Sequence, residues 1–107
     1  MNDDCIFCKI VKKETPSQVE VETDDLLVFK DINPKAPIHF LIIPKKHIKD
    51  ITEVDDQVFV EIKNMVLSLA KKYNVGGFRI VTNAGAAAAV GHMHVHFLGE
   101  VKVEREI

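Results

Sequence analysis

Three histidines alternate with apolar residues in one segment of the chain, at positions 92, 94 and 96. The apolar residues between and after them are Met93, Val95 and Phe97. Side chains alternate between the two faces of a β-strand, so this segment predicts a strand with imidazoles on one face and apolar groups on the other. The apolar face suits a core, whereas imidazoles that merely face solvent gain nothing from such regularity. We favour a functional strand over a chance spacing of surface histidines.

Composition and charge narrow the class of protein. The 107 residues are 47% hydrophobic and 28% charged, which is ordinary for one globular domain with its own core. A formal net charge of -2 argues against a nucleic-acid partner bound through its phosphates. No apolar segment approaches the roughly 20 residues of a membrane span, and Asn-Asp-Asp at residues 2–4 has the wrong charge for a secretory leader. We expect a single cytoplasmic domain, residues 1–107, without membrane or nucleic-acid partners.

Hydrophobic periodicity indicates further strands. Apolar alternation or short apolar runs predict them at residues 18–22, 26–29, 38–43 and 78–82. The third of these should be stopped by Pro44, because proline has no N–H for the strand ladder.

Two helices are predicted. A short one covers residues 5–11, and a three- and four-residue apolar repeat from residue 54 to 73 predicts a long amphipathic one. Thr52 or Asp55 can cap the start of the long helix, and the pair Gly76 and Gly77 should end it. Strands joined mostly by short turns, with one long helix inserted, are typical of an α+β fold around an antiparallel sheet.

Cys5 and Cys8 are the chain's two cysteines. A disulfide across so short a spacing would close almost no loop, and the expected compartment is reducing. A thioredoxin-like redox pair should follow a strand within a βαβ unit, but nothing precedes this pair. Cysteine pairs at this spacing commonly supply half of a tetrahedral zinc site, so we predict zinc if two further ligands exist.

A single metal ion bound by all three alternating histidines is another hypothesis. Neighbouring histidines on one strand face lie roughly 7 Å apart and the outer two about 13 Å apart. Metal–nitrogen bonds are about 2 Å long, so three ligands from one flat strand would be strained. We favour a division of labour, in which one end of the strand joins Cys5 and Cys8 and the rest faces a substrate.

Six segments resemble one known family in the same order along the chain. They are residues 5–10, 29–34, 36–40, 43–48, 79–85 and 92–98. The last matches the His-x-His-x-His-x-x signature of the histidine-triad superfamily, where x is apolar. The six segments cover essentially the whole chain, and together they resemble the Hint-type branch of that superfamily.

This resemblance implies a fold, an assembly and a reaction. The fold is a five-stranded antiparallel sheet with one long and one short helix, and two protomers join their sheets into a continuous sheet in a homodimer. The reaction is hydrolysis at the α-phosphate of nucleoside phosphoramidates, as in an adenosine 5′-phosphoramidase that releases AMP. The middle histidine, here His94, attacks phosphorus, and the covalent nucleotidyl-histidine is then hydrolysed. Imidazole suits this role because it is a competent nucleophile when neutral near pH 7.

The same match implies roles for further residues. His96 and His39 support the phosphate and the imidazole network as catalytic residues beside His94. Asp31 and Ile32 border the nucleoside of a purine nucleotide such as AMP. Asn83 lies at the phosphate end of the nucleotide site, together with His94 and His96.

The metal site is also implied by the resemblance. In family members that carry the cysteine pair, zinc is completed by the histidine of the Lys-Lys-His segment and by the first triad histidine. Those residues are His47 and His92 here, so Cys5, Cys8, His47 and His92 are the expected ligands. Four protein ligands leave no open position, which makes the expected zinc structural.

The Ala-rich loop (residues 84–90) departs from the family pattern. It is two residues short, and it lacks the usual Gly-Gln-Ser and therefore any side-chain donor for the phosphate or leaving group. Losing a positioned donor or acid commonly lowers a rate by about 10²–10⁴, although backbone N–H groups can still bind phosphate. A catalytically weak nucleotide-binding or protein-interaction module is therefore the second hypothesis. Hydrolysis of dinucleoside polyphosphates ranks below the phosphoramidase, because no feature of the chain reads a second nucleotide.

Overall fold

The computed structural model describes residues 4–103 and has an α+β fold, as predicted. Its elements are α1 (Ile6–Val11), β1 (Val19–Glu22), β2 (Leu26–Lys30), β3 (Ile38–Pro44), α2 (Asp56–Lys72), β4 (Phe78–Thr82), the 3-10 turn η1 (Gly85–Ala87) and β5 (Val95–Gly99). The five strands form one antiparallel sheet in the order β1-β2-β3-β5-β4. No helix in residues 4–103 is long and apolar enough to cross a membrane.

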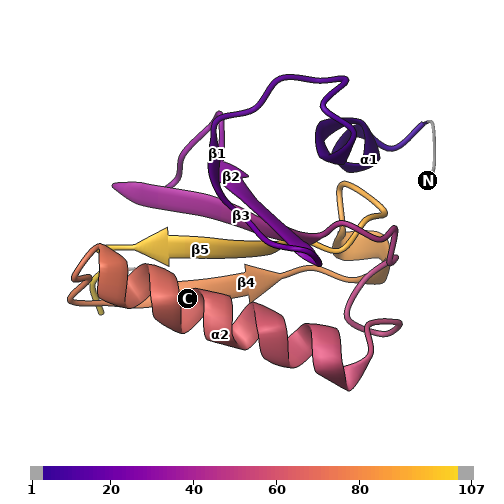
Figure 1. Ribbon diagram of the computed structural model, residues 1–107. Helices are drawn as coiled ribbons and strands as arrows, with labels where there is room; N and C mark the ends of the chain where they lie inside the picture. Colours follow the sequence, from indigo (N-terminus) through magenta and orange to yellow (C-terminus); the bar gives the residue numbers. More distant parts are fainter. Residues whose placement is uncertain (1–3, 104–107) are drawn as a thin grey trace.

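The two helices lie on opposite faces of the sheet (Figure 1). Alternation along the central strands feeds an apolar cluster on each face. In β2, Leu26 and Val28 belong to the cluster under α2, whereas Leu27 and Phe29 belong to the cluster under α1. Both faces of β2 and β3 are therefore buried, which is why these strands read as continuous apolar runs in the sequence.

The long helix begins as predicted and ends earlier than predicted. Asp55 is its N-cap, and its carboxylate accepts a hydrogen bond from the N–H of Val58 at 2.8 Å. At the other end Asn74, and not a glycine, takes the left-handed conformation with φ of 49°. The N–H of Val75 then donates to the carbonyl of Ala70 at 3.0 Å, which is the Schellman pattern that ends a helix. The prediction that Gly76 and Gly77 end this helix was wrong, because asparagine tolerates the same conformation.

The histidine strand is shorter than predicted. β5 begins at Val95, and residues 92–94 lie outside the strand ladder. Pro44 was expected to stop β3, but it is the last residue of that strand, and its carbonyl accepts a hydrogen bond from the ring Nε2–H of His92 at 2.8 Å. The N–H of Met93 donates to the carbonyl of Ile48 at 2.7 Å. The alternation still holds across the boundary, because Met93 and Val95 both lie in the cluster under α2.

Candidate functional site

Four side chains converge where α1 approaches the end of the Ala-rich loop. The Sγ atom of Cys5 lies 3.3 Å from Nδ1 of His92, and the Sγ atom of Cys8 lies 3.2 Å from Nδ1 of His47. One ligand atom from each of these four residues lies within 4.8 Å of all the others. The cysteines are placed by the first turn of α1, where the Sγ atom of Cys5 accepts from the N–H of Cys8 at 3.4 Å. The predicted set therefore comes together and could hold one metal ion.

The chemical state of His92 suits a metal ligand. Its side chain is fully buried, and burial is the main reason why its pKa lies below the usual value. The ring therefore favours the neutral form, which is the form that binds metal. Because Nε2–H donates to the carbonyl of Pro44, the lone pair on Nδ1 faces the two sulfur atoms. The donors and their surroundings thus fit a metal ion.

A second group consists of His39 on β3, His96 on β5 and Asp31 directly after β2. The backbone N–H of Lys35 donates to Nδ1 of His39 at 3.0 Å, so the proton of the neutral ring is on Nε2. That Nε2–H lies 2.9 Å from Nδ1 of His96 and 3.4 Å from a carboxylate oxygen of Asp31. It donates to His96, whose own proton is then on Nε2 when the ring is neutral. The structure brings together the three predicted residues Asp31, His39 and His96.

The protonation of His96 is consistent with this chain of hydrogen bonds. Burial lowers the pKa of His96, and the neighbouring rings of His94 and His39 lower it further, against an opposing effect of Asp31. These causes favour a neutral imidazole. A neutral His96 accepts at Nδ1 and presents an N–H at Nε2.

His94 lies between the two groups. It is buried, and its ring centroid is 5.3 Å from that of His96. The Nδ1 atom lies 2.9 Å from the main-chain oxygen of His92. A carbonyl oxygen can only accept, so Nδ1 of His94 carries a proton, and in the neutral ring the lone pair is on Nε2. This neutral tautomer is the nucleophilic form of imidazole.

Phe7 connects α1 to these histidines. Its ring contacts the ring of His94 edge-on at 5.1 Å between centroids and that of His92 at 5.9 Å. Phe7 follows Cys5 and precedes Cys8 in the chain, so the residues that position the cysteines also position this ring. The candidate metal site and the central histidine thus share one short helix.

An apolar cavity of about 210 Å³ lies between α1 and the end of β2. The residues that line its apolar part are Ile6, Phe7, Ile10, Phe29 and Leu41. Its polar border includes Asp31 and Ser17, and Ile32 lies there with 91% of its surface exposed. An apolar pocket with a carboxylate at its edge suits a nucleoside, in which a flat ring is joined to a sugar with hydroxyl donors.

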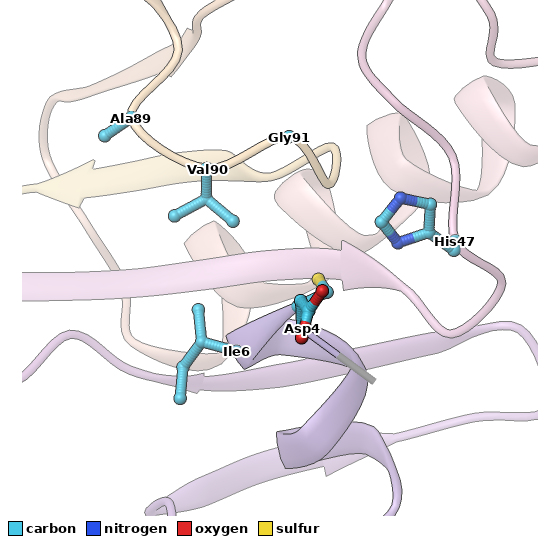
Figure 2. Close-up of a pocket in the computed structure, with 7 residues that line it drawn as sticks. Asp4, Ile6, His47, Ala89, Val90 and Gly91 are labelled. Atoms are coloured by element: carbon cyan, nitrogen blue, oxygen red, sulfur yellow. The ribbon is translucent and has the colours of Figure 1, made fainter. Parts of the chain in front are cut away.

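A second cavity, of about 370 Å³, lies beside the candidate metal site. Figure 2 shows the ring of His47 and the carboxylate of Asp4 at this cavity, with Val90 and Gly91 of the segment before the triad opposite them. Residues 89–91 offer only apolar side chains or none at this wall. Any polar contact from this segment to a ligand must come from the main chain.

Asn83 directly follows β4, next to His94 directly before β5. Thr82 pairs with Val95 in the antiparallel ladder, so the register places the next residue, Asn83, opposite His94. Asn83 is half-buried. Its role at the phosphate end of the site stays a prediction.

Sequence reasoning missed three residues that contact the site or its supports: Phe7, Asp50 and Thr82. Phe7 reads as an ordinary core residue between two cysteines. The order Asp50-Ile51-Thr52 is a turn signal that could have placed the carboxylate against the N–H of Thr52, although not against a distant loop. Thr82 ends a strand and carries no sequence signal of its contact with His94.

Comparisons with known proteins agree with this geometry. A family model described as "Scavenger mRNA decapping enzyme C-term binding" matches residues 4–105. "Protein HitA" of Neisseria gonorrhoeae is 38% identical over 103 residues, which cover 91% of this chain and 96% of that protein. A "HIT family hydrolase" from Clostridium thermocellum has a TM-score of 0.90 and 38% identity over 100% of this chain and 99% of its own. A "ZN-bound histidine triad family protein" from Mycobacterium smegmatis has a TM-score of 0.84 and 27% identity, covering 94% of this chain and 78% of its own.

The matched family model spans nearly the whole described chain, and the relative and the solved structures cover most of it. The similarity to a solved HIT family hydrolase supports a hydrolase in general. The matched residues include the three alternating histidines, His92, His94 and His96. The chain belongs to the histidine-triad (HIT) family, as the matched family model and these relatives show.

Proposed function

We propose that this protein is a nucleotide hydrolase that cleaves the P–N bond of nucleoside phosphoramidates and releases AMP. The observation that carries the proposal is the hydrogen bond from Nδ1–H of His94 to the carbonyl of His92 at 2.9 Å. It holds the ring in one orientation and in the tautomer whose lone pair is on Nε2. Such a preset nucleophile needs no proton removed before it attacks phosphorus.

The proposed reaction uses the tautomers of His94 and His96 described above. In the first step Nε2 of His94 forms a bond to the α-phosphorus, and the P–N bond to the amine breaks as the amine takes up a proton. In the second step water attacks the nucleotidyl-histidine, which releases AMP and restores the imidazole. The Nε2–H of neutral His96, fixed by the chain from Lys35 through His39, donates a hydrogen bond to a phosphate oxygen and stays on the ring, and the leaving amine takes its proton from water.

Nucleoside recognition is assigned to the cavity between α1 and β2. Its apolar wall suits a purine base, and Asp31 can accept from ribose hydroxyls. One oxygen of Asp31 already accepts from the N–H of Asn33 at 2.8 Å, which fixes the orientation of the carboxylate. Ile32 projects at the same edge, where a bound sugar would cover it.

Zinc is the metal that we propose for the set Cys5, Cys8, His47 and His92. Zinc–sulfur and zinc–nitrogen bonds of about 2.3 and 2.0 Å at tetrahedral angles give sulfur-to-nitrogen edges of roughly 3.5 Å. The corresponding edges here are 3.2 to 3.5 Å. The zinc-bound structural neighbour supports the same choice of metal. A cytoplasmic location belongs to this proposal, because a reducing compartment keeps both cysteines as thiols.

A homodimer that continues the sheet is also proposed. β4 is an edge strand in the described sheet, so one side of its backbone is available for antiparallel pairing with a second copy. Ile80 on this strand is 54% exposed, and Phe59 on α2 is 42% exposed beside it at an apolar groove. A two-fold axis at the middle of this edge and perpendicular to the sheet would pair β4 antiparallel with its copy and bury both side chains.

The experiment incubates the protein with adenosine 5′-phosphoramidate, follows AMP release, and searches the quenched enzyme for a nucleotidyl adduct by mass spectrometry. We expect an adduct on His94 and loss of turnover by at least about 10³ in His94→Ala. His47→Ala is not a suitable control because it removes a metal ligand, so Ser68→Ala at an exposed position on α2 serves instead. Full turnover by His94→Ala would refute the mechanism.

One observation favours a second function, a nucleotide-binding module with weak catalysis. Residues 89–91 present no polar side chain at the cavity beside the site. AMP binding without turnover of adenosine, guanosine or cytidine phosphoramidates would favour this module.

A further inference from the structure

Two tethers hold the connection between β4 and η1. At one end, the hydroxyl of Thr82 donates to the main-chain oxygen of His94 at 2.8 Å. At the other end, the backbone N–H of Gly85 donates to a carboxylate oxygen of Asp50 at 3.1 Å. Asn83 lies between the two tethered residues. The first tether thus acts directly on the backbone of the proposed nucleophile.

The carboxylate of Asp50 is built into the fold as a hydrogen-bond acceptor. The residue is 3% exposed, and its other oxygen accepts from both the backbone N–H and the hydroxyl of Thr52. A buried carboxylate is stable only when such donors surround it. These hydrogen bonds, first those of Thr52 and then that of Gly85, lower the pKa of Asp50. The side chain is therefore ionised and fixed at neutral pH.

Gly85 donates this hydrogen bond from a backbone conformation that other residues avoid. Its φ is 60°, and a Cβ added there would meet no atom within 4 Å. The glycine is needed for backbone conformation rather than for space. Asp50 thus fixes the point at which the chain turns sharply into η1.

The Ala-rich loop gives these tethers a consequence for function. Residues 84–91 carry no polar side chain, so this part of the chain can bind a phosphate only through its backbone N–H groups and the amide of Asn83. Backbone donors are useful only when the main chain is held in place, because a shift of about 1 Å can cost about 10²-fold in rate. Resting on the proposed function, we propose that Asp50 and Thr82 are positioning residues. They hold the segment from Asn83 to Gly85 against His94 so that it binds the substrate phosphate.

The test compares Asp50→Ala and Thr82→Val with two matched controls. Glu53→Gln changes an exposed side chain near Asp50 and leaves the link to Gly85, and Thr82→Ser keeps the hydroxyl. The first readout is the ratio of the Kd for adenosine to the Kd for AMP, which isolates the contribution of the phosphate. We expect this ratio to fall at least fivefold in Asp50→Ala and Thr82→Val, with the Kd for adenosine unchanged within twofold. Both controls should keep the wild-type ratio.

The second readout is turnover of the phosphoramidate well below the Tm of each variant. We expect kcat to fall about 10- to 100-fold in the two test variants while KM changes less than threefold. A merely structural role would lower the Tm but leave the Kd ratio and kcat unchanged, and that result would overturn the proposal. An effect of Glu53→Gln as large as that of Asp50→Ala would overturn it as well.

A third readout separates this proposal from the proposed function. Hydrogen exchange at the amide of Gly85 needs neither ligand nor turnover. We expect protection in the wild type and at least tenfold faster exchange in Asp50→Ala. Unchanged exchange refutes the tether whether or not the protein is a hydrolase. Another pair of results is faster exchange in Asp50→Ala together with a wild-type protein that neither cleaves phosphoramidates nor binds AMP better than adenosine. That pair of results refutes the function and leaves the tether standing. Should Asp50→Ala fold poorly, Thr82→Val tests the same Kd ratio from the other end.

Discussion

The Nδ1 atom of His94 lies 2.9 Å from the main-chain oxygen of His92, whose own ring belongs to the candidate metal site. The residue proposed to attack phosphorus is thus oriented by the backbone of a residue proposed to bind metal. Phe7 adds a second link, because it lies on the helix that carries Cys5 and Cys8 and contacts the ring of His94. Metal binding and nucleophile orientation share the same local structure.

Removing the metal should therefore affect both stability and turnover. Structural zinc contributes roughly 10–16 kcal/mol in small domains, against a typical domain stability of about 5–15 kcal/mol. We expect a chelator, or the double substitution Cys5→Ser and Cys8→Ser, to lower the Tm by at least about 10 °C and to reduce kcat. Calorimetry with elemental analysis checks this, and Val19→Ser on β1 is the control for an unrelated apolar-to-polar change. Stoichiometric zinc whose removal leaves the Tm unchanged would contradict the structural role.

The pKa of His96 predicts how stability depends on pH. In the folded protein that pKa is lowered by burial, then by His94 and His39, with Asp31 acting in the opposite direction. An unfolded histidine binds a proton near pH 6.5. Below that pH the unfolded state binds more protons at this site than the folded state, so stability falls as pH falls. The contribution is fully present above about pH 6.5 and is lost as the pH drops through the folded pKa.

Two measurements check this expectation. An NMR titration of the His96 ring should give a midpoint below about 6.5. Urea unfolding at pH 7 and pH 5.5 should show a smaller loss of stability in His96→Asn than in the wild type. A midpoint at or above the ordinary value would show that the ring is stabilised as a cation, and would remove its proposed role as a neutral acceptor.

Ile80 should control dimer formation if β4 pairs with a second copy. A charge at this position, half-exposed in the protomer, would be buried without a partner in the dimer. We expect Ile80→Lys to convert a dimer to a monomer by light scattering, without a large change in secondary structure. Val19→Lys is the matched control, because Val19 is 44% exposed on β1, the opposite edge strand. Dissociation by the control and not by Ile80→Lys would place the interface at the other edge.

The sequence predicted the strands and both helices, whereas it missed Phe7, Asp50 and Thr82 among the residues at the site. Strands β2 to β5 follow from apolar runs and alternation, because burial on one or both faces leaves a direct pattern in the sequence. The ends of the elements were less predictable. Asn74, and not a glycine, ends the long helix, and the strand ladder begins only at Val95, so that the ring of His92 is free to donate to the carbonyl of Pro44. The link from Asp50 to Gly85 joins residues far apart in the chain and leaves no periodic signal.

Phe7 allows the shared role of α1 to be tested without touching a ligand or the nucleophile. Its ring packs against Phe29 and His94 and lines the proposed nucleoside cavity. Truncating a buried phenylalanine to alanine costs about 3–5 kcal/mol, whereas a swap that nearly conserves volume usually costs less than about 1.5 kcal/mol. We expect Phe7→Leu to fold with zinc bound, and to lose roughly three- to tenfold in adenosine affinity because the flat ring is gone.

Phe7→Ala should also weaken zinc binding, because the helix loses its main apolar contact with the sheet. Competition with a chromogenic chelator measures the zinc affinity, and calorimetry with adenosine measures the nucleoside site. Ile10→Val is the control, since Ile10 lines the same cavity and is buried but makes no ring contact with the described histidines. If Phe7→Leu and Phe7→Ala both bind adenosine as the wild type does, the base does not occupy the cavity beside α1, and Asp31 must then recognise a different part of the substrate.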